Sequence, residues 1–127
     1  MGARLMDQPG FYSVVRYCPD LDRGEAVNVG VIVGAPGLGT RVRMAERNEH
    51  VKRRFGAEFD DTRLTLVKDG LTERLKDVEP TTEALAAFGA AEAGRLQISA
   101  PRPMVVSELD GDLLGLFERL VETERSR

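Results

Sequence analysis

Hydrophobic residues occupy every second position in the first third of the chain, which is the spacing of half-buried β-strands. The segment 11–18 (FYSVVRYC) is rich in aromatic and β-branched residues, and 40–44 (TRVRM) alternates as well. In 25–33 the alternation is complete, and one face carries four valines: Val27, Val29, Val31 and Val33. The opposite face carries Ala26, Asn28, Gly30 and Ile32. Short connections rich in Pro, Asp and Gly join the three segments, so we predict an antiparallel β-meander.

From residue 48 onward the hydrophobic spacing changes to three and four residues, which is typical of helices. A short helix is predicted over 48–55, with Asn48 as its cap and Gly56 as its stop. A longer helix is predicted to start near Asp61 or Thr62 and to end before Pro80. We allow for a break at a glycine inside it, position 70. Its hydrophobic face consists of Leu64, Val67, Leu71, Leu75 and Val78.

The last third of the chain predicts a helix, a strand and a final helix. The helix runs from Thr82 to Gly94, and the alternation in 95–100 (RLQISA) predicts a fourth strand that two prolines close. The final helix begins at Ser107 or Asp110. Its expected core face consists of Leu113, Leu114, Phe117, Leu120 and Val121. This order predicts an α+β fold, an antiparallel β-meander with helices packed on one face.

Neither a repeat nor a linker divides the sequence, so 11–122 is predicted to be a single α+β domain. We expect 1–10 to be a flexible N-terminus and 123–127 a frayed C-terminal tail. A chain of 127 residues with 42% hydrophobic residues is long enough to bury a core. No apolar run approaches the roughly 20 residues of a membrane span, and the N-terminus lacks the apolar stretch of a signal peptide. We therefore expect a cytoplasmic protein.

The composition argues against several kinds of site. A single cysteine, Cys18, and a single histidine, His50, match no disulfide framework and no usual zinc spacing, so we predict no metal and no cofactor. We interpret Cys18 as a partly buried strand residue and His50 as a solvated helix residue. The glycine-rich segment 34–39 lacks the Lys that follows in a phosphate-binding loop, so we interpret it as a hairpin loop. The net charge of −3 argues against nucleic-acid binding through bulk charge.

The hairpin formed by 11–18 and 25–33 carries more polar residues than a structural hairpin requires. If Tyr12 faces Gly30, then Arg16 faces Ala26 and is a diagonal neighbour of Asn28 on the same face. The aromatic ring would then cover the glycine, an arrangement that stabilises sheets. A shift of one residue would separate Arg16 from Asn28, so this register is itself a prediction.

Two interpretations of these polar residues remain open. In the structural one, Asn28 bonds a loop carbonyl, Glu25 pairs with Arg23 or Arg16, and Gly30 marks a bulge or close packing. In the functional one, the residues form a pocket for a small anion or a nucleotide. Arg16 would bind the anion, Asn28 would orient it, and Gly30 would permit close approach. Glu25 would act as an acid or base, or hold Arg16 in place.

The run from Arg16 to Val33 resembles the signature RYxPDxxRGExxNVGVxV of the domain of unknown function 3037 family, which consists of small bacterial proteins. The resemblance covers most of the chain when 96–103 and the terminal helix are included. Two residues depart from the pattern, because Ala26 replaces an aromatic residue and Cys18 an aliphatic one. The family has no assigned activity. The resemblance also implies a HipA-like kinase as a candidate partner, because genes of such kinases often neighbour those of the family.

Three functions are compatible with the sequence. The leading hypothesis is a non-enzymatic accessory or regulatory module that binds a protein partner, because no nucleophile–base pair or metal cluster is recognisable. The alternative is an anion- or nucleotide-binding domain, or an enzyme, that uses Arg16, Glu25, Asn28 and Gly30, with Arg41, Arg43 and Arg102 nearby. The third is a nucleic-acid-binding regulator that acts through local arginines, which the net charge argues against.

Overall fold

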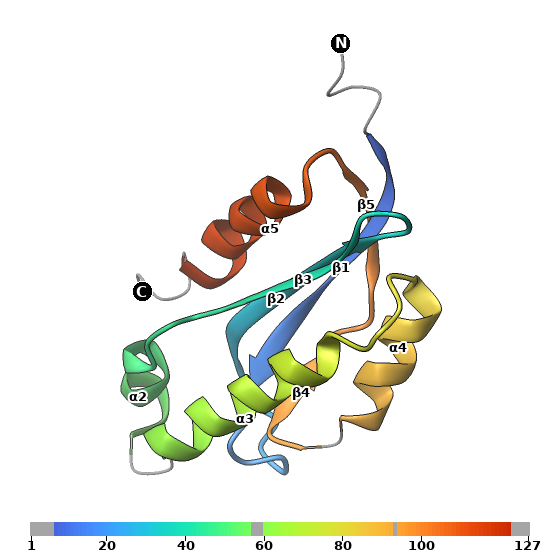
Figure 1. The fold of residues 1–127 in the computed structure, drawn as a ribbon. Helices are drawn as coiled ribbons and strands as arrows, with labels where there is room; N and C mark the ends of the chain where they lie inside the picture. Colours follow the sequence, from blue (N-terminus) through green and yellow to red (C-terminus); the bar gives the residue numbers. More distant parts are fainter. Residues whose placement is uncertain (1–6, 57–59, 93, 123–127) are drawn as a thin grey trace.

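The long first strand is the centre of a five-stranded antiparallel sheet (Figure 1). The computed structural model describes residues 7–56, 60–92 and 94–122. The strand order is β3-β2-β1-β4, and β5 pairs with the first half of β1 while β4 pairs with its second half. The strands are β1 (Gln8–Tyr17), β2 (Val27–Ala35), β3 (Gly39–Met44), β4 (Leu96–Ile98) and β5 (Arg102–Val106). The predicted meander of the first three strands is therefore confirmed.

Helices lie on both faces of this sheet. One face is covered by α3 and α4, and the other by α5 with the π-helical turn η2 that continues it (Figure 1). The helices are α2 (Glu49–Phe55), α3 (Asp61–Leu75), α4 (Thr82–Ala91), α5 (Leu109–Phe117) and η2 (Glu118–Glu122). The α+β class is confirmed, but the placement of the helices differs from the prediction, which put them all on one face. No helix in the described ranges is long and apolar enough to cross a membrane.

Each face of the sheet has its own hydrophobic cluster. The first, which we name the α3–α4 cluster, consists of Phe11, Val15, Tyr17, Val27, Val29, Ile32, Val51, Leu64, Leu71, Leu75, Leu85 and Leu96. The second, which we name the α5 cluster, consists of Val31, Val33, Ala35, Ala45, Val106, Leu109, Leu113, Leu116, Phe117 and Val121. Both faces of the central strands are thus buried, as expected for a sheet between two helical layers.

A β-bulge divides β2 between these two clusters. The register of β1 with β2 shifts between Val15 and Arg16, and Val29 has no partner residue in β1. An extra residue in one strand shifts the alternation of its side chains between the two faces by one position. The alternate positions that face a given helical layer before the bulge therefore face the other layer after it. The predicted single valine face is split accordingly, between Val27 and Val29 in one cluster and Val31 and Val33 in the other.

The observed hairpin register also differs from the predicted one. Arg16 lies directly opposite Asn28, not opposite Ala26, so the two residues are direct neighbours on one face instead of diagonal ones. The physical reason is the length of the connection, since β2 begins at Val27 and leaves a loop of residues 18–26 between the strands.

An aromatic ring does cover a glycine in this hairpin, at a different pair from the predicted one. Tyr12 lies opposite Val33, whereas Phe11 lies opposite Gly34. A Cβ at Gly34 would lie 2.5 Å from Cζ of Phe11, so only glycine leaves room for this ring. The predicted packing of an aromatic ring over a glycine thus occurs in this hairpin, but between a different pair of residues.

Two strand segments were not expected from the sequence. β1 already begins at Gln8, inside the segment 1–10 that was predicted to be flexible, and this part of β1 pairs with β5. β5 contains Pro103, which was predicted to end a strand. Proline is tolerated here because β5 is an edge strand. Residues 1–6 and the predicted tail 123–127 lie outside the described residues.

The predicted helices are present, with small differences at their ends. The caps of α3 and α4 are Asp60 and Thr81, whose side chains accept backbone N–H bonds from inside their helices. α3 continues through Gly70 without a break. On α5, Leu114 is 42% exposed although it was expected in the core, and Leu116 is buried instead.

Candidate functional site

Arg16 and Asn28 lie side by side, but Asn28 is engaged in bonds that hold the fold together. Its side-chain Nδ2 donates to the carbonyl oxygen of Leu120 at 2.9 Å, and its backbone carbonyl oxygen lies 3.2 Å from Nε2 of His50. Asn28 therefore connects β2 both to η2 and to α2. The side chain of Arg16 is exposed, and it forms no hydrogen bond or ion pair with the residues that the structure describes.

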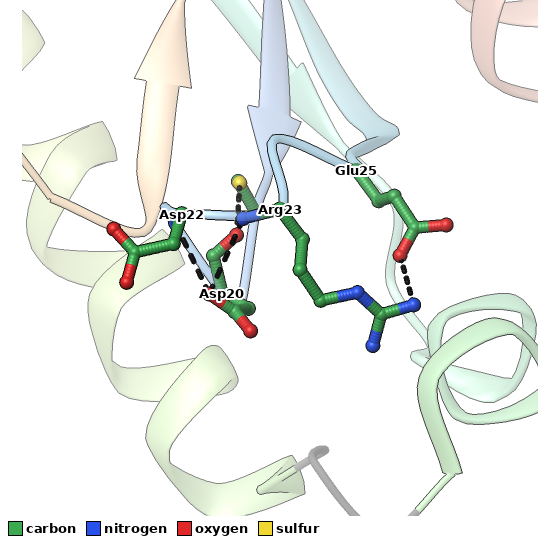
Figure 2. A network of polar contacts seen from close by, with 5 residues as sticks. Asp20, Asp22, Arg23 and Glu25 are labelled. Atoms are coloured by element: carbon green, nitrogen blue, oxygen red, sulfur yellow. Dashed lines mark hydrogen bonds and ion pairs between the residues drawn. The ribbon is translucent and has the colours of Figure 1, made fainter.

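Glu25 and Gly30 have other neighbours. Glu25 forms an ion pair with Arg23 at 2.5 Å, and both side chains are exposed (Figure 2). A Cβ at Gly30 would meet the sulfur of Met44, which packs against the α3–α4 cluster on the face opposite Asn28. These contacts are of the kind that the structural interpretation expects. Gly30 does not lie on the face where Arg16 and Asn28 meet.

Of the three arginines expected near the site, Arg41 and Arg43 have side-chain partners, whereas Arg102 is exposed at the start of β5. Arg41 lies 3.6 Å from a carboxylate oxygen of Asp110, and the guanidinium of Arg43 lies 4.9 Å from the ring centre of Phe117. His50 is 5% exposed, so its interpretation as a solvated residue is wrong. Cys18 is buried as well, directly after the end of β1. Within the described ranges, no group of three or more His, Cys, Asp or Glu side chains is placed to hold a metal ion.

Asp20 shapes the loop of residues 18–26, which we name the signature loop. Its Oδ1 accepts hydrogen bonds from the backbone N–H of Asp22 at 3.1 Å and of Arg23 at 3.4 Å (Figure 2). Its carbonyl oxygen accepts a hydrogen bond from the thiol of Cys18 and another from the backbone N–H of Gly24. Gly24 has a φ of 71°, a conformation that favours glycine. The Pro-Asp-x-x-Arg-Gly part of the signature thus encodes a defined turn.

A cavity of about 620 Å³ lies beside this loop, and we name it the signature-loop cavity. It brings together residues from β1, the signature loop, the start of α3 and the residue before β4. They are Tyr17, Pro19, Asp20, Leu21, Asp22, Asp60, Arg63 and Arg95. Tyr17 and Pro19 are buried, whereas the charged residues are partly or fully exposed, so an apolar floor lies within a charged rim. Sequence reasoning missed this cavity because it joins segments that are up to 78 positions apart.

Hydrogen bonds fix the walls of the signature-loop cavity. Arg95 donates from Nε to the carbonyl oxygen of Pro19 at 2.8 Å, and the N–H of Cys18 donates to the carbonyl oxygen of Arg95 at 2.7 Å. Oδ1 of Asp60 accepts the N–H of Arg63 at 3.0 Å and so caps α3. The signature loop is thereby attached to β4 and faces a well-defined helix end.

A second polar group that the sequence did not indicate surrounds Lys68 on α3. Lys68 is only 4% exposed, and its Nζ donates to the carbonyl oxygen of Ala45 at 2.7 Å and to Oδ1 of Asn48 at 2.6 Å. Burial lowers the pKa of Lys68 below its ordinary value of 10.5. Nδ2 of Asn48 donates to Oδ1 of Asp61 at 2.7 Å and to the hydroxyl of Thr65 at 3.2 Å.

This arrangement changes the role predicted for Asn48. It does stand immediately before α2, but its side chain makes no capping bond and joins α3 to the preceding loop instead.

The sequence held a signal for the burial of Lys68. The buried residues of α3 follow one another at spacings of three and four, and they are Leu64, Lys68, Leu71 and Leu75. Val67 was predicted to lie on the core face of this helix, yet it is 38% exposed. A cavity of about 570 Å³ adjoins Asn48, with Glu46, Arg47, Glu49, Lys52, Asp61 and Thr65 as its other lining residues.

Comparisons with known proteins agree with the resemblance that the signature indicated. A search of curated proteins and a search of solved structures found no match. A family model described as "Protein of unknown function (DUF3037)" matches residues 12–121, which include all of the signature loop and both hydrophobic clusters except Phe11. Because this match covers most of its length, the chain belongs to the DUF3037 family.

Proposed function

We propose that this protein is a non-enzymatic accessory module that binds a protein partner through the signature loop and the first turns of α3. The observation that carries the proposal is the signature-loop cavity, where a buried apolar floor, a charged rim and the exposed side chain of Leu21 occur together. Protein interfaces have this composition, with an apolar centre surrounded by polar groups.

Exposed hydrophobic residues extend this surface along α3. Leu21 is 56% exposed and lines the cavity together with Arg63. Leu66 and Val67, which are 65% and 38% exposed, follow Arg63 at three and four residues and are therefore its neighbours on the helix. An apolar strip beside a charged cavity favours recognition of another protein.

The rigidity of the surface also favours binding. The signature loop is fixed by Asp20 and by its bonds to Arg95, so little conformational freedom is lost when a partner is bound. Ordering a loop on association costs free energy that a preorganised loop does not lose. The family suggests the first partner to test, a HipA-like kinase.

The proposal is tested by placing a photocrosslinking amino acid at position 21 in the source organism, with the same residue at position 105 as the matched control. Val105 is 65% exposed and lies on β5, away from the signature loop. The protein crosslinked from position 21 is then purified, and its affinity is measured with Leu21→Asp and Val105→Asp.

We expect Leu21→Asp to weaken the affinity by about tenfold or more, as at an interface hot spot, and Val105→Asp to leave it unchanged. Equal affinities of the two variants, or crosslinking from position 105 alone, would contradict the proposal.

A second candidate function is the binding of a small anion at Arg16. It is favoured by one observation, that this arginine is exposed beside Asn28 and has no side-chain partner among the described residues. Titration of phosphate and nucleotides against the parent protein and Arg16→Gln tests it. Arg16→Gln should abolish a shift that the parent shows.

A further inference from the structure

The charges around the signature-loop cavity allow the chemistry of the bound segment to be specified. Building on the proposed function, we infer that the cavity receives a peptide segment of the partner in which a basic side chain stands next to an acidic group. The basic side chain contacts the carboxylates of the rim, and the acidic group contacts its arginines.

Two of the three carboxylates are held in place by the fold and still have one oxygen available. Asp20 uses Oδ1 to accept two backbone N–H groups of the signature loop, and Asp60 uses Oδ1 to cap α3. Their Oδ2 atoms form no hydrogen bond within the part of the chain that the structure describes. Carboxylates fixed in this way are preorganised acceptors for a guanidinium or an ammonium group.

The two arginines of the rim do not neutralise these carboxylates. No ion pair joins Arg63 or Arg95 to Asp20, Asp22 or Asp60 among the residues described. Arg95 is bonded through Nε to a carbonyl oxygen, which leaves its terminal nitrogens for other acceptors. Five charged side chains of both signs thus line one cavity, and no ion pair joins them to one another in the described part of the chain.

This mixture of charges favours a segment that carries both signs. A purely basic segment would approach two guanidinium groups, and a purely acidic one would approach three carboxylates, so each is disfavoured by repulsion. When a basic group stands next to an acidic one, the basic group contacts the carboxylates and the acidic group contacts the guanidinium groups. The apolar floor of Tyr17 and Pro19 fits the methylene stem of an arginine or lysine, which packs against apolar surface while its charged end contacts the rim.

The smallest probe of this chemistry is N-acetyl-L-arginine, which carries a guanidinium and a carboxylate and no free amine. Its matched control is N-acetyl-L-argininamide, which has the guanidinium alone. Each is titrated against the full ¹⁵N-labelled chain, and the amide shifts of residues 17–25 and 60–63 are followed by NMR. We expect the acid to bind with a Kd of roughly 1 mM or weaker, as is usual for a ligand of this size, and roughly two- to fivefold more tightly than the amide.

Two conservative variants separate the contributions of the charges. Asp60→Asn removes one negative charge while keeping a good helix cap, and it should weaken both probes by a similar factor. Arg63→Gln removes one positive charge from a side chain without a described partner, and it should weaken the acid while leaving the amide unchanged. Asp77→Asn and Arg102→Gln alter exposed residues outside the cavity and should change neither probe.

Five outcomes separate a failure of this inference from a failure of the proposed function. Equal affinities for acid and amide, or an effect of Asp77→Asn as large as that of Asp60→Asn, would overturn it, and so would shifts confined to residues outside the cavity. If position 21 crosslinks a partner but neither probe binds, the partner-binding function stands and this inference fails. If the acid binds as expected but Leu21→Asp does not affect a partner, the charge chemistry holds and the partner-binding function fails.

Discussion

The side-chain amine of Lys68 and the side-chain oxygen of Asn48 lie 2.6 Å apart, and both residues are buried. The same amine bonds the carbonyl oxygen of Ala45, so a single lysine holds the segment between β3 and α2 against α3. Burying an ammonium group is costly unless its hydrogen-bonding capacity is used, and here two of its three donors have partners. The lysine therefore connects the sheet edge to the helical layer.

Replacing Lys68 by methionine should destabilise the protein. The methionine keeps most of the apolar stem, but it leaves two buried oxygen acceptors without the donor they have now. We expect a loss of about 1–3 kcal/mol in the free energy of unfolding, measured by urea denaturation. Lys76→Met, which removes an exposed lysine paired with Glu73, should cost less than about 1 kcal/mol. Equal effects of the two variants would show that the buried bonds contribute little.

The stability contribution of Lys68 should depend on pH. Its pKa is lowered in the folded state by burial, although the carboxylates of Asp69 and Asp61 oppose this shift. Between the folded pKa and the unfolded value of 10.5, the unfolded chain binds more protons, so stability rises with pH. The difference in unfolding free energy between the parent and Lys68→Met should therefore increase in the parent's favour as the pH approaches 10.5 and then level off. A difference that stays constant through this range would contradict the lowered pKa.

Asn28→Ala should destabilise the fold, because it removes the bond to the carbonyl oxygen of Leu120 in η2. We expect a loss of about 1–3 kcal/mol, measured by denaturant unfolding. The matched variant is Arg16→Gln, the direct neighbour across the strands, whose exposed side chain should cost less than about 0.5 kcal/mol. If Asn28→Ala unfolds like the parent, the bond between β2 and η2 does not stabilise the fold.

Phe117→Ala should have the largest effect among the α5 variants. Phe117 is 3% exposed in the α5 cluster, and its ring also supports the guanidinium of Arg43. Truncating a buried phenylalanine costs about 3–5 kcal/mol, because it leaves a cavity. Leu114→Ala, on the exposed side of the same helix, should cost less than about 1 kcal/mol, and thermal unfolding compares the two. Similar melting temperatures would place the helix in a different orientation on the sheet.

Local patterns in the sequence determined most of the secondary structure. The alternation in 11–18 and 25–33 and the three- and four-residue spacing in α3 follow from the geometry of single elements, so they are visible without knowledge of neighbours. The signature from Arg16 to Val33 likewise identified the family. The signature also includes the loop beside the candidate cavity, although the site was predicted on the strands on either side of this loop.

Only the tertiary structure decided which faces of these elements are buried and which side chains meet. The bulge at Val29 redistributes the valines of β2 between two helical layers, and its position depends on the pairing with β1. The pairing of β5 with Gln8–Tyr12 and the burial of Lys68 depend on contacts between segments 20 or more positions apart. Arg63 and Arg95 likewise line the signature-loop cavity together with Asp20, although they are far from it along the chain. Such contacts leave no periodic signal along the chain, because the energy of a long-range pair depends on where two separate elements come together.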